Sequence, residues 1–174
     1  ITGNASLKYD IIKDLYVKVS GNIYLYEAIN ESFTKATQTY SQIFANPQVF
    51  NTTRPATWSQ NRTVQQQYNA IINYTKRIGN NHNINAMLGA ETFGQKSLNS
   101  QVSGSGAPTD DIPTVNASTI FNAGSNFSSK SEYRIISHFG RINYDYDQRY
   151  LLTLVYRADG ISSLAKDNRW ANLV

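Results

Sequence analysis

The sequence predicts an all-β fold, an antiparallel up-and-down transmembrane β-barrel to which this chain contributes about six strands. Apolar and polar residues alternate over several long stretches, as the two faces of a strand require. Short turns and long loops also alternate between these stretches, an asymmetry typical of outer-membrane barrels. Finally, charged residues make up only 16% of the chain and aromatics 12%, whereas soluble domains average about 25% charged residues.

The first predicted hairpin has strands at about 4–12 and 15–29, joined by the two-residue turn Lys13-Asp14. Periodicity is lost at about 30–61, where Pro, Thr, Gln and Asn accumulate, and a long extracellular loop is expected there. Trp58 falls in this loop and is a candidate for stacking on a ligand.

The second predicted hairpin has strands at about 62–78 and 84–95. The connecting segment 79–83 has the sequence GNNHN, and Gly and Asn tolerate the positive φ angles of tight turns. A second long loop, rich in Ser, Gly, Asn and Pro, is expected at about 97–131.

The third predicted hairpin has strands at about 133–146 and 150–160, joined by Asp147-Gln148-Arg149. Each strand reaches the length of about 9–11 residues that a tilted strand needs to cross a bilayer. A third loop is expected at about 161–174.

This third hairpin has one apolar, aromatic-tipped face and one polar face. Its outward face is predicted to carry a girdle of tyrosines at the membrane interface, although the same side chains could simply pack within the sheet: Tyr144, Tyr146 and Tyr150. The polar face is expected to point into the lumen, either as an internal network or as a substrate surface, and its candidates are Arg141, Asn143, Arg157 and Asp159.

Composition also excludes several classes of function. The net charge of +4 comes from scattered residues, so no nucleic-acid partner is expected. The absence of Cys excludes disulfides and thiolate metal sites. His82 and His138 are distant in sequence, and we expect no metal, cofactor or catalytic residues. No run of about 18 apolar residues is present, so no transmembrane helix is expected.

Residues 139–170 contain four motifs, which read FGRINYDY, RYLL, R-x-DG and, after Ser162-Ser163, DNRW. Together these motifs resemble the signature of SusC/RagA-type TonB-dependent outer-membrane transporters. The resemblance implies a barrel of about 22 strands that actively imports a bulky nutrient, an oligosaccharide or an oligopeptide, and is not an enzyme.

The same resemblance implies four partners: a SusD-like surface lipoprotein as a lid, the TonB complex through parts outside this chain, outer-membrane lipid, and the substrate. It also implies that the DNRW motif, Asp167, Asn168, Arg169 and Trp170, orders a loop edge. We expect no plug domain within residues 1–174. Because Ile1 follows no signal peptide and the chain ends directly after a motif, both ends are expected to lie inside a longer protein.

Two alternatives follow from the same patterns. A soluble extracellular β-sandwich that binds glycans would bury its apolar strand faces against each other in a core. An outer-membrane barrel could also serve as an enzyme, which needs a clustered nucleophile and base or paired carboxylates, or as a passive porin, which lacks a plug.

Overall fold

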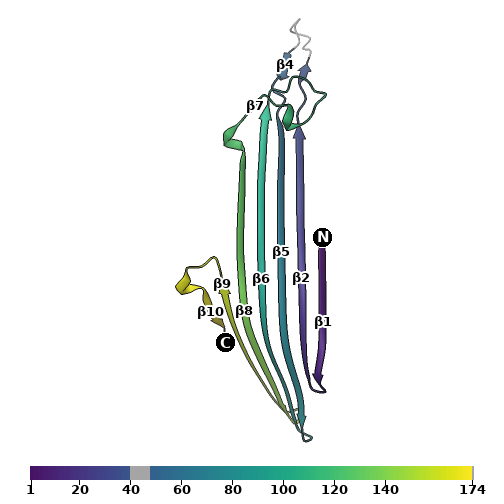
Figure 1. Ribbon diagram of the computed structural model, residues 1–174, viewed down its shortest axis with the longest axis vertical. Helices are drawn as coiled ribbons and strands as arrows, with labels where there is room; N and C mark the ends of the chain where they lie inside the picture. The colour runs from purple at the N-terminus through teal and green to yellow at the C-terminus, as the bar shows by residue number, and fades with distance from the viewer. Residues whose placement is uncertain (40–47, 174) are drawn as a thin grey trace. The chain divides into compact units, whose positions relative to one another are not determined.

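The computed structural model describes residues 1–39 and 48–173, and these residues are mostly β-strand (Figure 1). Six of the strands are long: β1 (Thr2–Ile12), β2 (Leu15–Phe33), β5 (Ala56–Ile78), β6 (His82–Ser105), β8 (Phe127–Tyr146) and β9 (Tyr150–Ile161). Four are short: β3 (Thr37–Thr39), β4 (Gln48–Asn51), β7 (Ile120–Phe121) and β10 (Trp170–Leu173). Three 3₁₀ turns complete the fold: η1 (Val115–Ala117), η2 (Ala123–Ser125) and η3 (Lys166–Asn168).

The long strands form one sheet in the order β1-β2-β5-β6-β8-β9-β10, with β7 paired to β6 (Figure 1). Consecutive long strands pair antiparallel, as β1 does with β2 and β8 with β9. Strands β3 and β4 form a separate two-stranded sheet. The predicted all-β, antiparallel, up-and-down fold is therefore confirmed.

The chain divides into two compact units, and four of the long strands, β2, β5, β6 and β8, contribute residues to both. The first unit comprises residues 1–25, 64–96 and 132–174 and contains the three tight turns. The second comprises residues 26–63 and 97–131 and contains the long connections.

The described residues bury almost no hydrophobic core. Only Ala56, Ala107 and Ala158 are buried apolar residues, whereas Leu7, Leu88 and many other large apolar side chains are exposed. A sandwich would instead cover such side chains with a second sheet. The β-sandwich alternative is therefore wrong for the part of the chain that the structure describes.

Strands β2, β5, β6 and β8 extend well beyond their predicted ends on the side away from the tight turns, and the predicted loops at 30–61 and 97–131 are correspondingly too long. Strand β5 begins at Ala56, so Trp58 lies in a strand, and β6 continues to Ser105. The prediction relied on apolar alternation, but a backbone ladder also continues under polar side chains that bond to each other. The hydroxyls of Thr57 and Ser103, for example, lie 3.2 Å apart. Residues 40–47 of the first predicted loop lie outside the described residues.

The predicted third loop at 161–174 is also partly wrong, because the chain turns back as the edge strand β10. Trp170 pairs with Gly160 and Leu173 with Arg157. The amide of Ile161 donates to the carbonyl of Arg169 at 2.9 Å. This bond closes the connection between β9 and β10, so the backbone hydrogen bonding of the sheet continues into β10.

Backbone hydrogen bonds connect the ends of neighbouring hairpins at the tight turns of the first unit. The amide of Asp147 donates to the carbonyl of Asn81 at 2.7 Å, and that of Thr75 to the carbonyl of Asp14 at 2.8 Å. Within the described part of the chain, no helix is long and apolar enough to cross a membrane.

An ion pair organises the connections of the second unit. The Nε of Arg54 lies 2.6 Å from Oδ1 of Asp110, which also accepts the amide of Ala36 at 3.1 Å. A further bond joins Nη1 of Arg54 to the carbonyl of the buried Ala107 at 3.3 Å. The hydrogen bond from Arg54, followed by that from the Ala36 amide, lowers the pKa of Asp110 below its usual value.

Candidate functional site

The sheet of the first unit has two chemically different faces. The register of β8 and β9 sets Phe139 opposite Arg157 and Gly140 opposite Tyr156, so these two pairs point to opposite faces. We call the side of Phe139 and Arg157 the polar face and the side of Gly140 and Tyr156 the tyrosine-rich face. Strand β6 follows the same division, because Leu88 lies over Gly140.

Arg157 is the centre of a hydrogen-bonded group on the polar face. Its Nε lies 2.8 and 3.0 Å from the two carboxylate oxygens of Asp159, two positions along β9. Its Nη2 donates to the hydroxyl of Ser137 on β8 at 3.0 Å. Ser137 is 1% exposed and pairs with Asp159 across the two strands. The turn at Asp147–Arg149 fixes this register and thereby brings the three side chains together.

The same group extends across three further strands. The Nη2 of Arg157 lies 3.8 Å from Oε1 of Glu91 on β6. The other oxygen of Glu91 accepts from the amide of Gln67 on β5 at 2.9 Å, and Gln67 accepts from Asn22 on β2 at 3.4 Å. We call this set the polar belt: Asn22, Gln67, Glu91, Ser137, Arg157 and Asp159.

An aromatic ring closes one side of the belt. The guanidinium carbon of Arg157 lies 5.8 Å from the centre of the Phe139 ring, within the range of a cation–π contact. The ring covers Gly89 so closely that a methyl group there would overlap it. Glycine is thus required at position 89 for Phe139 to lie flat against β6.

A second polar group lies on the same face near the turns. Asn143 accepts a hydrogen bond from Thr153 at 3.1 Å. The amide of Asn85 donates to the hydroxyl of Thr75 at 2.8 Å, and Asn83 donates to Asp145 at 3.3 Å. Side chains from four strands therefore continue the polar surface from the belt to the turns.

The predicted lumen candidates are only partly brought together. Arg157 and Asp159 form the centre of the belt, whereas Asn143 belongs to the group near the turns. Arg141 is exposed and makes no hydrogen bond or ion pair within the described part of the chain. Trp58 belongs to the second unit, is half-buried, and points to the other side of β5 from Thr57, which faces Ser103.

The three predicted girdle tyrosines lie on the tyrosine-rich face. The hydroxyl of Tyr144 lies 2.7 Å from Nδ1 of His82, whose ring centre is 4.9 Å from that of Tyr146. Tyr146 in turn stacks on Tyr150 at 6.3 Å. The sequence predicts His82 in the turn at 79–83, but His82 is the first residue of β6 and contacts Tyr144 and Tyr146.

The DNRW motif forms the return from β9 to β10. Asp167 and Asn168 lie in η3, and Nε of Arg169 donates to the carbonyl of Leu164 at 3.0 Å. Trp170 leaves the loop, lies over Gly160 and stacks on His138 with ring centres 5.9 Å apart. It therefore packs on the tyrosine-rich face of the sheet.

Four members of the belt were not among the predicted site residues: Asn22, Gln67, Glu91 and Ser137. Alternation along each strand places them on polar faces, but their meeting with Arg157 depends on the register between strands. Side chains of the belt can exchange hydrogen bonds with a polar ligand, since those of Glu91 and Asp159 are each 22% exposed. Among the described residues, no three His, Asp or Glu side chains are grouped to hold a metal ion.

Known proteins resemble this chain both in sequence and in fold. The chain is 35% identical to TonB-dependent receptor P26 of Formosa agariphila over 125 residues, 65% of this chain. It is 53% identical to TonB-dependent receptor SusC of Bacteroides thetaiotaomicron over 36 residues, 21% of this chain. A solved structure of the RagAB peptide transporter matches 98% of this chain with a TM-score of 0.85.

The chain is thus similar in sequence to TonB-dependent receptors, SusC among them, and similar in fold to the RagAB transporter. It spans 11% of the length of receptor P26, 4% of SusC and 18% of the matched RagAB chain. RagAB is 19% identical in sequence, so that match supports the fold alone. No family profile matches the chain.

Proposed function

We propose that the chain forms part of the wall of an outer-membrane β-barrel that imports a bulky nutrient in a TonB-dependent way. The observation that carries the proposal is the sheet of long strands, which has one apolar face that no second layer of the described residues covers and one hydrogen-bonded polar face. Lipid can cover such an apolar face, and a water-filled lumen can solvate the polar one. The relatives named TonB-dependent receptors support the transport role and argue against an enzyme.

The length of the apolar section supports a membrane crossing. On the tyrosine-rich face of β5 this section lies between Gln66 and Lys76, and on β6 it lies between His82 and Thr92. The two residues of each pair are ten positions apart. A tilted strand crosses a bilayer in about 9–11 residues. Tyr68 and Tyr74 stand at the two ends of the section on β5, as girdle residues do.

The open edges of the sheet support a larger barrel. Within the part of the chain that the structure describes, strands β1 and β10 each pair with a neighbour on one side only. Unpaired backbone groups are costly in lipid, so in a membrane these edges require further strands. We propose that these come from the rest of a barrel of about 22 strands.

In this arrangement the polar belt, Asn143 and Arg141 face the lumen. The ion-paired belt stiffens the wall, and the unpaired Arg141 is available to an acidic or polar group of an oligosaccharide or oligopeptide. The connections of the second unit, together with Trp58 near the start of β5, meet substrate and a SusD-like lipoprotein lid, while TonB engages parts outside this chain. Asp167, Asn168 and Arg169 order the loop that carries Trp170.

The decisive experiment is labelling of single cysteines in the full-length protein, since the chain itself contains no Cys. Ile142→Cys lies on the tyrosine-rich face and Asn143→Cys on the polar face of the same strand. We expect a water-soluble maleimide to label the cysteine at position 143 only. A quencher dissolved in the lipid should reach a fluorescent probe attached at position 142 but not one at position 143. Equal labelling of both by the maleimide would exclude a membrane-facing side.

Energy coupling is tested in whole cells by uptake of fluorescent oligosaccharides and oligopeptides before and after addition of a protonophore. Loss of uptake supports active import. Unchanged uptake would favour the passive porin.

A further inference from the structure

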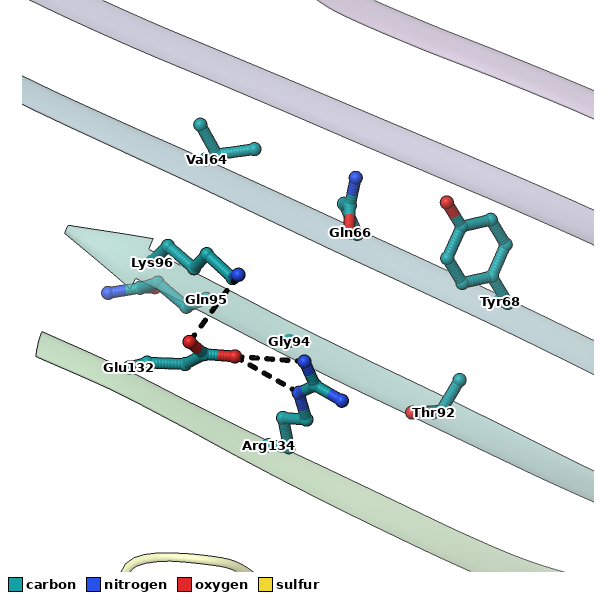
Figure 2. Close-up of a pocket in the computed structure, with 9 residues that line it drawn as sticks. All are labelled: Val64, Gln66, Tyr68, Thr92, Gly94, Gln95, Lys96, Glu132 and Arg134. Carbon is teal, nitrogen blue, oxygen red and sulfur yellow. Dashed lines mark hydrogen bonds and ion pairs between the residues drawn. The ribbon is translucent and has the colours of Figure 1, made fainter.

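The apolar section of the tyrosine-rich face ends at a charged groove on the side away from the turns. Lys96, Glu132 and Arg134 lie there, with Tyr68 at the border of the apolar section (Figure 2). The groove measures about 350 Å³. Gly94 leaves its floor open, because the nearest atom to a methyl group there would be Cγ of Arg134, at 3.8 Å.

Glu132 holds the two cations in place. Lys96 Nζ lies 3.4 Å from Oε2 of Glu132, and Nη2 and Nε of Arg134 lie 3.0 and 3.1 Å from its Oε1 (Figure 2). The third guanidinium nitrogen of Arg134 points away from the carboxylate (Figure 2). The side chains of Lys96 and Arg134 are 63% and 64% exposed, so both cations are accessible from solvent.

A second hollow continues from the first. Arg134 lines it as well, together with Arg169, Trp170, Gly160 and Ile161. Three cations and one carboxylate thus lie along this border, flanked by Tyr68 on one side and Trp170 on the other. Positive charge exceeds negative charge along this border, and its aromatic groups suit a membrane–water interface.

We infer that this groove binds the phosphate-bearing sugar headgroup of an outer-leaflet glycolipid. Arg134 and Lys96 match a phosphate, the first through its fork of donors and the second as a point charge. The amide of Gln66 and the hydroxyl of Thr92 line the same groove and can bond to sugar hydroxyls. The acyl chains would lie on the apolar section that begins at Tyr68.

A glycolipid suits the site better than a protein partner. The groove adjoins an uncovered apolar surface, and its net charge is complementary to a phosphate. This inference rests on the proposed membrane orientation of the tyrosine-rich face. The cysteine labelling at positions 142 and 143 tests that orientation separately, so failure of the lipid experiment with normal labelling would overturn this inference alone.

The test is lipid retention by the full-length protein in detergent, measured by native mass spectrometry. Three probes are compared: monophosphoryl lipid A, the same lipid without its phosphate, and phosphatidylglycerol. We expect retention of the first to exceed that of the dephosphorylated lipid by about tenfold, as the loss of a charge-assisted contact implies. Phosphatidylglycerol keeps a phosphate but has no sugar to bond to Gln66 and Thr92, so it should also be retained less than the first. Equal retention of all three would overturn the inference.

Three variants separate binding from folding. Arg134→Gln and Lys96→Gln should each weaken retention of monophosphoryl lipid A, whereas Glu132→Gln should strengthen it by removing the competing carboxylate. A merely structural role for the ion pairs would make all three changes act in the same direction. Heat-modifiability of each variant on electrophoresis reports whether the barrel is folded.

Lys76→Gln is the matched control. Lys76 also lies on the tyrosine-rich face, but on β5 near the tight turns, where it pairs with Asp14 at 2.9 Å. Its replacement removes the same charge and should leave lipid A retention unchanged. If Arg134→Gln behaves like Lys76→Gln, or releases a co-purified lipoprotein without changing lipid retention, the groove is not a glycolipid site.

Discussion

The guanidinium of Arg157 donates to the hydroxyl of Ser137 on the neighbouring strand at 3.0 Å, and Ser137 is the largest fully buried side chain of the described residues. The same guanidinium contacts Asp159 and Glu91. One side chain therefore links strands β6, β8 and β9 on the polar face. Its loss affects a buried hydroxyl as well as two carboxylates.

Replacement of Arg157 by Gln should lower the free energy of unfolding by about 1 kcal/mol, because the Arg157 side chain is 39% exposed and solvent screens its ion pairs. Urea unfolding of the full-length protein in detergent measures the change. Arg141→Gln is the control, since Arg141 makes no such contacts in the described part of the chain, and it should change stability by less than about 0.5 kcal/mol. Equal effects of the two changes would show that the belt does not support the wall.

Gly89→Ala should destabilise the sheet by about 1–3 kcal/mol, because the added methyl overlaps the Phe139 ring and forces it away from β6. Gly94→Ala serves as the control, because it meets no atom closer than 3.8 Å. Combining Gly89→Ala with Phe139→Leu should recover part of the loss. Simple additivity of the two changes would mean that the ring and position 89 do not interact.

The turn between β8 and β9 contains two non-glycine residues in the left-handed region, Asp147 at φ 54° and Gln148 at φ 56°. Gln148→Gly should raise the free energy of unfolding by about 0.5 kcal/mol, since glycine removes the steric cost but adds freedom to the unfolded chain. Arg149→Gly should instead lower it, because the φ of Arg149 is not positive. Unfolding curves of both variants check the opposite signs.

The ion pair of Asp110 should make the connections of the second unit sensitive to acid. Its folded-state pKa is lowered, mainly by the hydrogen bond from Arg54. Asp110 therefore contributes fully to the stability of these connections above its unfolded pKa of about 3.9. This contribution is lost as the pH falls through its lower folded-state pKa. Pepsin cleavage near Ala36 and Ala107 should rise steeply in that window.

Asp110→Asn should reproduce this acid effect at neutral pH, with faster cleavage by a neutral protease at the same sites. Asp111→Asn is the matched control, because among the described residues Asp111 bonds only to the nearby Thr109. Similar cleavage of the two variants would mean that the Arg54 contact does not hold the connections.

The sequence predicted the faces of β8 and β9 because side-chain direction follows alternation alone. Arg157 and Asp159 share a face whatever the neighbouring strands do. The link from Arg157 to Glu91 could not be predicted in this way, since it depends on how β6, β8 and β9 are aligned. A shift of one residue would turn Glu91 to the opposite face.

The strand ends were missed for a different reason. Around Thr57 and Ser103 the apolar signal fades while the backbone ladder continues, so Trp58 was expected in a loop. The position of Trp170 in an edge strand was also missed, because no sequence pattern indicates that the chain turns back after η3 to pair with β9. Predicted loops in such sheets are therefore upper bounds on the real connections.

The three tight turns have a consequence for the order of assembly. Each joins two neighbouring strands, so β1 with β2, β5 with β6, and β8 with β9 are local pairs that require no distant contact. Short hairpins close within about 1–10 μs, whereas joining one pair to the next requires closure of a long connection. Hairpins are thus the natural kinetic units of this wall, and the slow events are the dockings of β2 on β5 and of β6 on β8.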